Sequence, residues 1–176
     1  MSSFPPEGHR LELLSTSHRR RRFASGDTHV DEWLQRKALS ATAKNTSTTR
    51  VLAHSEAEIA GFYTLANTAL DVSLVPPELF TGAPPARPPP TVTLAWLGVD
   101  QRFAGRGLGT KLFARALADC VRAYRLVRFT AVIVDALTDQ NDAFYRAQGF
   151  ARVPGTTHKL YLPASTLLSV VAHDER

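Results

Sequence analysis

The segment VTLAWLGVDQRFAGRGLGTKLF, residues 92–113, decides the fold of this chain. Residues 92–99 are its most apolar stretch, which is typical of a strand buried on both faces of a sheet. A glycine-rich turn follows. Apolar residues then recur at helical spacing, namely Leu108, Leu112, Phe113, Ala116, Leu117, Cys120, Val121 and Tyr124. The order of strand, glycine turn and amphipathic helix predicts an α/β protein.

The glycine turn has the chemistry of an anion site. The first backbone N–H groups of a helix lack partners within the helix and carry partial positive charge, which suits a phosphate. Gly105, Gly107 and Gly109 would let the backbone approach the anion closely, and Arg102 and Arg106 add charge. A helix start entered by a flexible turn, with no ligand, explains the glycines equally well. The turn lacks Gly-Lys-Ser/Thr and the Gly-x-Gly-x-x-Gly spacing, which disfavours an ATP or nicotinamide enzyme.

Two motifs carry a family resemblance. Residues 102–107, RFAGRG, match the Gln/Arg-x-x-Gly-x-Gly/Ala signature of the GNAT acetyltransferases, and the stretch before them, 97–100, is similar to the end of that family's fourth strand. Residues 144–150, FYRAQGF, resemble the family's Phe-Tyr-x-x-x-Gly-Phe segment. The resemblance covers roughly residues 50–162. It implies the GNAT fold, a mixed central sheet of about six or seven strands flanked by about four helices.

The resemblance also assigns residues to acetyl-CoA. The backbone at the end of the strand would pair with the pantetheine, through Leu97, Gly98 and Val99. The loop would hold the diphosphate through Arg102, Phe103, Ala104, Gly105, Arg106, Gly107, Leu108, Gly109 and Thr110. The hydroxyl of Tyr145 would protonate the leaving thiolate, although a core tyrosine is the alternative. The family often has a cofactor-binding asparagine six residues before the Phe-Tyr pair; Thr138 stands there, and Asn141 is the nearer candidate.

The N-terminal half is similar to the GNAT toxins of type II toxin–antitoxin modules, which extends the resemblance over about 23–162. The similar stretches are 23–26 (FASG), 30–34 (VDEWL) and 61–65 (GFYTL). This resemblance implies acetylation of the α-amine of aminoacyl-tRNA, a block of translation, and a small DNA-binding antitoxin as partner. Ala24 replaces the usual cysteine of these toxins and Trp96 replaces an arginine, and both departures bear on toxicity more than on acyl transfer.

Charge agrees with a polyanionic acceptor. The formal net charge is +5, and clustered cations are the electrostatic footprint of a nucleic-acid-binding surface. Candidate tRNA-binding residues are Arg19, Arg20, Arg21, Arg22, Arg36 and Lys37. A solvated arm is the alternative interpretation of the arginine run.

The remaining pattern predicts a helix over 29–43, entered through a capping box at residues 28–31, and a hairpin of strands 50–54 and 59–71. Seven prolines within 76–90 predict a long surface loop. A strand over 129–134, a helix over 141–148 and a last strand over 158–162 complete the expected fold. We expect a basic N-terminal arm (1–22), an acetyltransferase domain (23–165) and a C-terminal tail (166–176).

Composition restricts the setting and the mechanism. The sequence shows no membrane-spanning stretch and no secretory signal, so a cytoplasmic protein is expected. The single cysteine, Cys120, lies on an apolar helix stripe, which favours a core position and direct transfer without an acyl-enzyme. The six histidines show no metal-ligand spacing. A homodimer is a further expectation.

The sequence offers no unmistakable base, since Asp100, Asp135 and Glu58 look structural at predicted strand ends and turns. An α-amine, with a pKa of ~7.7–8.0, needs less help to lose its proton than a lysine at ~10.4, which favours an aminoacyl ester as acceptor. Two alternatives stay open. One is acetylation of a small amine or a protein N-terminus; the other is a CoA-binding or RNA-binding module without turnover.

Overall fold

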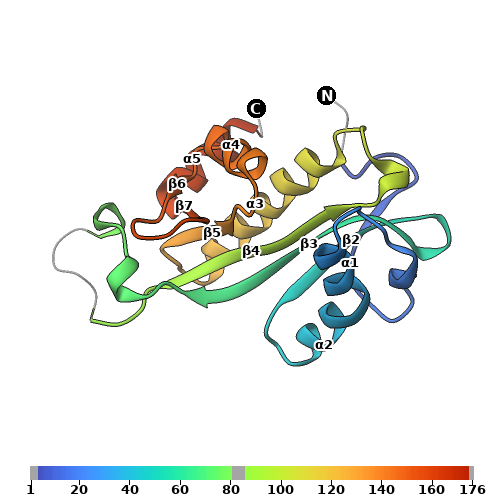
Figure 1. Cartoon of the computed structure of the whole chain (residues 1–176), viewed down its shortest axis with the longest axis horizontal. Coiled ribbons are helices and arrows are strands. Elements are labelled where there is room, and N and C mark those ends of the chain that lie inside the picture. The colour runs from blue at the N-terminus through green and yellow to red at the C-terminus, as the bar shows by residue number, and fades with distance from the viewer. Residues whose placement is uncertain (1–3, 81–85, 175–176) are drawn as a thin grey trace. The chain divides into compact units, whose positions relative to one another are not determined.

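The computed structural model describes residues 4–80 and 86–174. Within them the chain forms one seven-stranded sheet in the order β1-β2-β3-β4-β5-β7-β6. The strands are β1 (Arg10–Leu13), β2 (Thr48–His54), β3 (Glu58–Ala69), β4 (Pro90–Val99), β5 (Ala131–Asp135), β6 (Ala151–Arg152) and β7 (Lys159–Pro163). The helices are α1 (Thr28–Glu32), α2 (Ala38–Ala43), α3 (Leu108–Leu126), α4 (Asp139–Ala147) and α5 (Ala164–Asp174). Figure 1 shows their course along the chain.

The sheet is mixed. β1 pairs antiparallel with β2, and β2 pairs antiparallel with β3. β4 and β5 pair in parallel over Thr91–Thr93 and Ala131–Ile133, whereas β7 pairs antiparallel with both β5 and β6. Because α1 and α2 belong to one helical segment, the described residues contain four helical segments and a mixed sheet of seven strands. This confirms the predicted fold class.

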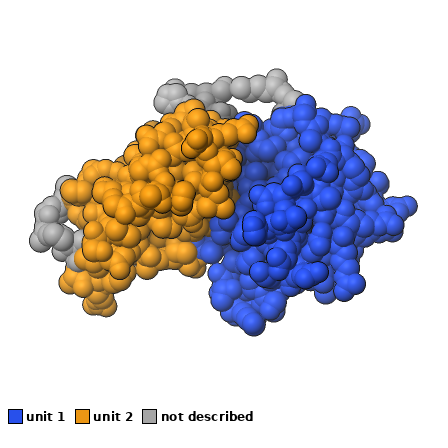
Figure 2. Space-filling view, viewed as in Figure 1, with its two compact units in different colours: residues 1–66, 95–116 blue, residues 67–94, 117–176 orange. Residues whose placement is uncertain are grey.

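The chain divides into two compact units, which Figure 2 colours separately. Unit 1 comprises Met1–Ala66 and Ala95–Ala116, and unit 2 comprises Asn67–Leu94 and Leu117–Arg176. In unit 1 one core cluster joins Leu14, Phe23, Leu34, Ala38, Val51, Ile59 and Phe62. In unit 2 another joins Leu70, Ala131, Ile133, Val153 and Tyr161. The predicted arm, domain and tail boundaries stay a prediction, although β1 lies within 1–22 and most of α5 within 166–176.

The first helical segment departs from its prediction in two ways. Its N-cap is Asp27, whose side chain accepts hydrogen bonds from the N–H groups of His29 and Val30 at 2.9 and 3.3 Å. The expected capping box beginning at Thr28 was therefore wrong by one residue, because an aspartate is an equally good cap. The expected helix 29–43 is also interrupted by a π-helical turn, η2 (Trp33–Lys37), between α1 and α2.

The predicted hairpin is confirmed as β2 and β3, joined by the 3₁₀ turn η3 (Ser55–Ala57). Glu56 and Ala57 adopt left-handed φ values of 55° and 62°, which close the turn within three residues. In the proline-rich segment, η5 (Pro77–Leu79) precedes residues 81–85, which lie outside the described residues, and β4 already begins at Pro90. The prediction missed β1, β6 and α5.

The helix after the glycine turn is confirmed as α3. Its buried face includes Leu112, Ala116 and Cys120, all fully inaccessible to solvent. The spacing of these residues puts them on one side of the helix. Among the described helices, none has the length and apolar character of a membrane span. In the same part of the chain, no group of three or more His, Cys, Asp or Glu side chains is placed to bind a metal ion.

Candidate active site

The glycine loop lies in unit 1, between the end of β4 and the start of α3. A short 3₁₀ turn, η6 (Gln101–Phe103), leads into it. Gly105 and Gly107 have φ values of +74° and +71°, which L side chains rarely adopt. A Cβ built on either glycine would meet no atom within 4 Å, so the backbone faces open space at both positions. A ligand can therefore approach the main chain of the loop closely at these two positions.

The charge at this loop comes from the helix start and from Arg106. Leu108, Gly109 and Thr110 form the first residues of α3, whose early N–H groups carry partial positive charge. Arg106 is exposed, and its guanidinium lies 5.7 Å from the centre of the Phe103 ring. No carboxylate pairs with Arg106 among the described residues. Arg106 is thus available to an anion.

Asp100, at the end of β4, organises the approach to the loop. Its carboxylate accepts hydrogen bonds from the Ala24 N–H at 3.1 Å and from the Arg102 N–H at 2.9 Å. Its own N–H donates to the Ala60 carbonyl oxygen at 2.9 Å. Burial alone would raise the pKa of this carboxyl, but hydrogen bonds from Arg102 and Ala24 outweigh it and leave the pKa lowered. Asp100 is therefore a charged structural hub, as the sequence indicated, and has no free oxygen for use as a base.

Arg102 is engaged by two carboxylates. Its Nε and Nη2 donate to Asp100 at 2.9 and 3.1 Å, and its Nη1 donates to Glu58 Oε2 at 2.6 Å. The hydrogen bond to Asp100 raises the pKa of Arg102 further above its ordinary value. Glu58 also accepts from Arg22 at 3.0 Å, and the hydrogen bonds from both arginines lower the pKa of its carboxyl. The side chain of Arg102 thus fastens the loop, whereas the guanidinium of Arg106 is free.

The strand residues assigned to pantetheine differ in their surroundings. Leu97 and Val99 are half-buried, and Gly98 is buried. A Cβ on Gly98 would lie 2.6 Å from Val30 Cγ1 and 3.1 Å from Phe62. Packing against α1 and β3 therefore requires glycine at position 98, whether or not its backbone binds a cofactor.

Tyr145 lies in unit 2, on α4. Thr138 caps this helix by accepting from the Asn141 N–H at 3.1 Å, so the threonine that replaces the family's asparagine has a structural function here. Asn141 is exposed. Burial, and then the negative charge of Asp135, raise the pKa of the Tyr145 phenol. The hydroxyl therefore keeps its proton at neutral pH, which an acid catalyst requires.

Ion pairs fasten α4 beside Tyr145. Asp142 accepts from Arg146 Nε at 2.7 Å, one turn along the same helix. Its other oxygen accepts from Arg152 on β6, and Arg152 also donates to the Thr157 carbonyl oxygen. These contacts tie the helix to the strand and loop that follow it, and so restrict movement of Tyr145.

Cys120 is a core residue and not a nucleophile. It is fully buried on α3, and burial raises the pKa of its thiol to about 12. The thiolate, which is the reactive form, is therefore scarce at neutral pH. This agrees with the expectation of direct transfer.

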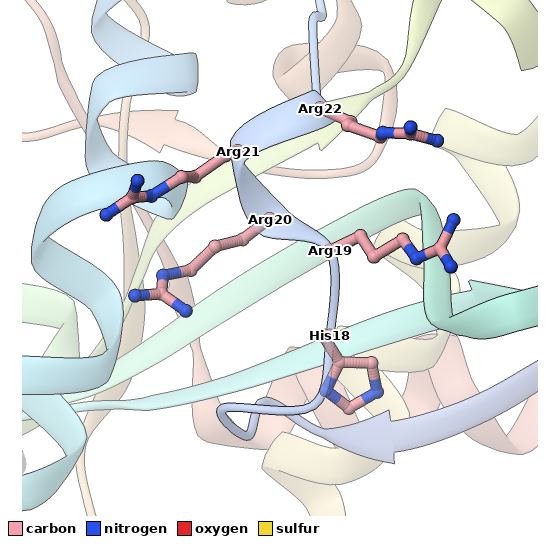
Figure 3. Close-up of a pocket in the computed structure, with 5 residues that line it drawn as sticks. All are labelled: His18, Arg19, Arg20, Arg21 and Arg22. Carbon is pink, nitrogen blue, oxygen red and sulfur yellow. The ribbon is translucent and has the colours of Figure 1, made fainter.

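The arginine run borders a cavity of about 280 Å³ lined by His18 and the four arginines. Figure 3 shows that the four arginine side chains diverge: Arg20 and Arg21 point to one side, and Arg19 and Arg22 point to the other. Arg19 pairs with Glu56 at 3.1 Å and Arg22 with Glu58 at 3.0 Å. The run is therefore packed on unit 1, and carboxylates neutralise half of it.

The other two arginines lie toward the helical segment. Arg20 Nε donates to the Gln35 carbonyl oxygen at 3.1 Å, and a backbone acceptor leaves its charge uncompensated. Arg36 and Lys37 are exposed on η2 beside Gln35, and Lys37 pairs loosely with Glu32 at 3.4 Å. The side chain of Arg20 thus reaches the helical turn that carries Arg36 and Lys37.

Two aromatic groupings were missed by sequence reasoning. Trp33 and Trp96 stack with ring centres 5.3 Å apart and an angle of 11° between the rings. The ring centres of His9 and His54 lie 4.5 Å apart, and both rings make T-shaped contacts with Phe103, in the turn that leads into the glycine loop. Their positions in the sequence gave no periodic signal, because each pair joins segments far apart along the chain.

Comparison with known proteins identifies the class, an acetyltransferase. Residues 11–150 match the Acetyltransferase (GNAT) family, so this chain belongs to that family. Among its relatives is a tRNA-acetylating toxin from Mycobacterium tuberculosis, 32% identical over 123 residues that cover 70% of this chain and 72% of the toxin.

Solved structures agree with the fold. A crystal structure of AtaTR bound with AcCoA superposes with a TM-score of 0.81 at 23% identity, covering 93% of this chain and 98% of that one. AtaT complexed with acetyl-methionyl-tRNAfMet superposes with a TM-score of 0.79 at 22% identity, covering 92% and 98%. At this level of identity the likeness establishes a shared fold.

Proposed function

We propose that this protein transfers the acetyl group of acetyl-CoA to the α-amine of an aminoacyl-tRNA, and thereby acts as a toxin that blocks translation. The observation that carries the proposal is the 32% identity to a tRNA-acetylating toxin over 70% of this chain. The open, positive-φ glycine loop with its unpaired Arg106 supports the donor half of the proposal. A cytoplasmic location and a small antitoxin partner belong to the same proposal.

The donor site uses main chain and one free cation. The N–H groups from Gly105 to Thr110 and the guanidinium of Arg106 would hold the diphosphate, since both supply positive charge to open space. Backbone groups of Leu97, Gly98 and Val99 would pair with the pantetheine. Arg102 would fix the loop from behind through Asp100 and Glu58. When bound, acetyl-CoA supplies the acetyl group as a thioester.

Tyr145 would act as the acid. The amine nitrogen would bond to the acetyl carbon of the thioester as the carbon–sulfur bond breaks. The Tyr145 hydroxyl would give the departing sulfur a proton, the amine would give up one proton to water, and water would return a proton to the Tyr145 oxygen. Asp100 and Glu58 are held by arginines and Asp135 pairs with Lys159 at 3.1 Å, so none of them is a free base. An acceptor amine of low pKa fits this arrangement.

The decisive experiment offers the protein acetyl-CoA with charged total tRNA, followed by mass analysis of the released amino acids. Acetylated amino acids are expected; their absence, with turnover of free amines instead, would favour the small-amine alternative. Acetyl-CoA binding without transfer to any amine would favour a binding module.

Tyr145→Phe tests the acid. Loss of the hydroxyl should lower kcat by about 10²-fold or more with little change in the KM for acetyl-CoA, because only the proton transfer is lost. Tyr124→Phe, a partly buried tyrosine on α3, is the matched control and should leave kcat unchanged. An unchanged kcat in Tyr145→Phe would remove Tyr145 from the mechanism.

A further inference from the structure

The two tryptophans of the chain stack on each other. Trp33 comes from η2 and Trp96 from β4, and both are half-buried at the edge of the unit 1 core cluster. Trp33 Nε1 donates to Thr64 Oγ1 at 3.1 Å, and Thr64 in turn shares a hydrogen bond with Thr49 at 2.8 Å. This chain of hydrogen bonds fixes the orientation of Trp33, and the stack fixes Trp96 against it. The pair is a rigid aromatic plane that keeps part of its surface in solvent.

The helical turn that carries Trp33 is unusual. A π-helical turn contains one residue more per hydrogen-bonded ring than an α-helix, is rare, and is frequently found at functional sites. Here it spans Trp33–Lys37 and so sets the directions of Trp33, Arg36 and Lys37 together. A tryptophan needed only for packing could be presented by an ordinary α-helix.

Two cations stand on the same turn as Trp33. Arg36 and Lys37 are exposed on the same turn. Arg20 reaches the Gln35 carbonyl oxygen, and Gln35 Nε2 donates to the Phe23 carbonyl oxygen at 2.8 Å, so the arginine run is tied to this turn. Aromatic rings combined with exposed cations are the composition with which proteins bind single-stranded nucleic acid, by stacking on bases and contacting phosphates.

We propose that Trp33 and Trp96 form a stacking platform for an unpaired nucleobase at the aminoacylated 3′ end of the acceptor RNA, with Arg20, Arg21 and Arg36 contacting the flanking phosphates. This rests on the proposed function, which makes the acceptor an RNA. Trp96 stands two residues before Gly98 on β4, the strand that would pair with pantetheine, so a base held there places its 3′ end near the donor. The flat, uncharged ring of Trp96 is suited to stacking on a base rather than to contacting a phosphate.

Binding can be measured without any acetyl transfer. Because the chain has only two tryptophans, both in the stack, intrinsic tryptophan fluorescence reports on the platform alone. A short single-stranded RNA with the 3′-terminal sequence of tRNA, uncharged and without acetyl-CoA, should quench this fluorescence saturably. The same oligonucleotide lacking its terminal base should bind more weakly and quench little.

Variants locate the effect. By anisotropy of a labelled oligonucleotide, Trp96→Leu should weaken binding roughly tenfold to a hundredfold, the range that loss of one stacked base represents. Trp96→Phe keeps an aromatic face and should bind with intermediate affinity. Tyr124→Leu, on α3, removes a half-buried aromatic ring outside the platform and should bind like the unaltered protein. If Trp96→Leu fails to fold, the quenching of the unaltered protein and the Trp96→Phe affinity still decide the proposal.

The outcomes separate this proposal from the proposed function. Absence of quenching, or equal affinity of Trp96→Phe or Trp96→Leu and the unaltered protein, would overturn the platform even if aminoacyl-tRNA is acetylated. Quenching that needs the terminal base, together with no acetylation of any charged tRNA, would retain the platform and reject the proposed function.

Discussion

The glycine loop and the arginine run each contain several arginines, and in each region carboxylates pair with some of them and leave others without a carboxylate partner. In the loop, Arg102 is held by Asp100 and Glu58, while Arg106 is exposed. In the run, Arg22 and Arg19 are held by Glu58 and Glu56, while Arg20 donates only to a backbone oxygen. Glu58 is common to both regions. A count of positive charges therefore overstates the charge that a phosphate can meet, and the carboxylates decide which arginines bind ligands and which build the fold.

The largest effect is expected at Asp100, which is the most buried of the three carboxylates that pair with these arginines. Asp100→Asn replaces the buried carboxylate with an amide that keeps one acceptor oxygen, so part of the four hydrogen bonds from Ala24 and Arg102 is lost. The free energy of unfolding should fall by about 3 kcal/mol, because a hydrogen bond to a charged group is worth about 1.5–3 kcal/mol. Urea denaturation measures the loss. Asp135→Asn breaks an exposed pair with Lys159 and should cost less than about 1 kcal/mol. Equal losses in the two variants would contradict a hub at Asp100.

The second prediction compares the two loop arginines. Arg106→Gln should raise the KM for acetyl-CoA roughly tenfold to a hundredfold with stability unchanged, because a charge-assisted contact to phosphate is lost. Arg102→Gln should chiefly lower stability. Initial rates at varied acetyl-CoA and thermal unfolding of both variants make the comparison. A larger rise in KM for Arg102→Gln than for Arg106→Gln would reverse the assignment.

The third prediction applies the same division to the arginine run. Arg20→Gln and Arg21→Gln should each weaken RNA binding several-fold and reduce the salt dependence of the affinity by about one unit of slope. Arg19→Gln and Arg22→Gln are matched controls, because Glu56 and Glu58 already neutralise those side chains. Binding titrations at several salt concentrations give the slopes. If all four variants had equal slopes, the division would not govern RNA binding.

The smallest effect concerns pH. The pKa of Asp100 is lowered in the folded state, so its ionised form favours folding. That contribution is complete above the unfolded pKa of ~3.9 and is lost as the pH falls through the folded value. The stability difference between the unaltered protein and Asp100→Asn should therefore shrink below about pH 4. Unfolding curves across acidic pH measure it, and a difference that stays constant would exclude this linkage.

Patterns local in sequence were predictable and partnerships across the chain were not. The glycine loop, α3 and the β2–β3 hairpin follow from spacing within short windows, and the structure confirms them. β1 was missed because four residues, RLEL, carry too little alternation and the strand is defined by its pairing with β2. The π-helical turn was missed because one inserted residue hardly disturbs a helical pattern.

In the candidate site too, features local in sequence were predictable and contacts between distant segments were not. The glycines and Tyr145 were identified from motifs, and Asp100 was recognised as structural. The partners of Arg102 and Arg19 could not be identified, because Glu58 and Glu56 reach them only through the fold. The Trp33–Trp96 stack likewise joins two residues that no local pattern relates.

The burial of Cys120 has a practical consequence for kinetics. The only thiol of the chain lies fully inside α3's apolar face, so a thiol reagent can modify it only when that helix opens. Under conditions where modification is fast compared with reclosing, the labelling rate equals the opening rate; where it is slow, the rate reports the opening equilibrium. The rate at which Cys120 is modified therefore measures the opening of α3 at a single site. It can show how far a bound cofactor or partner slows that opening.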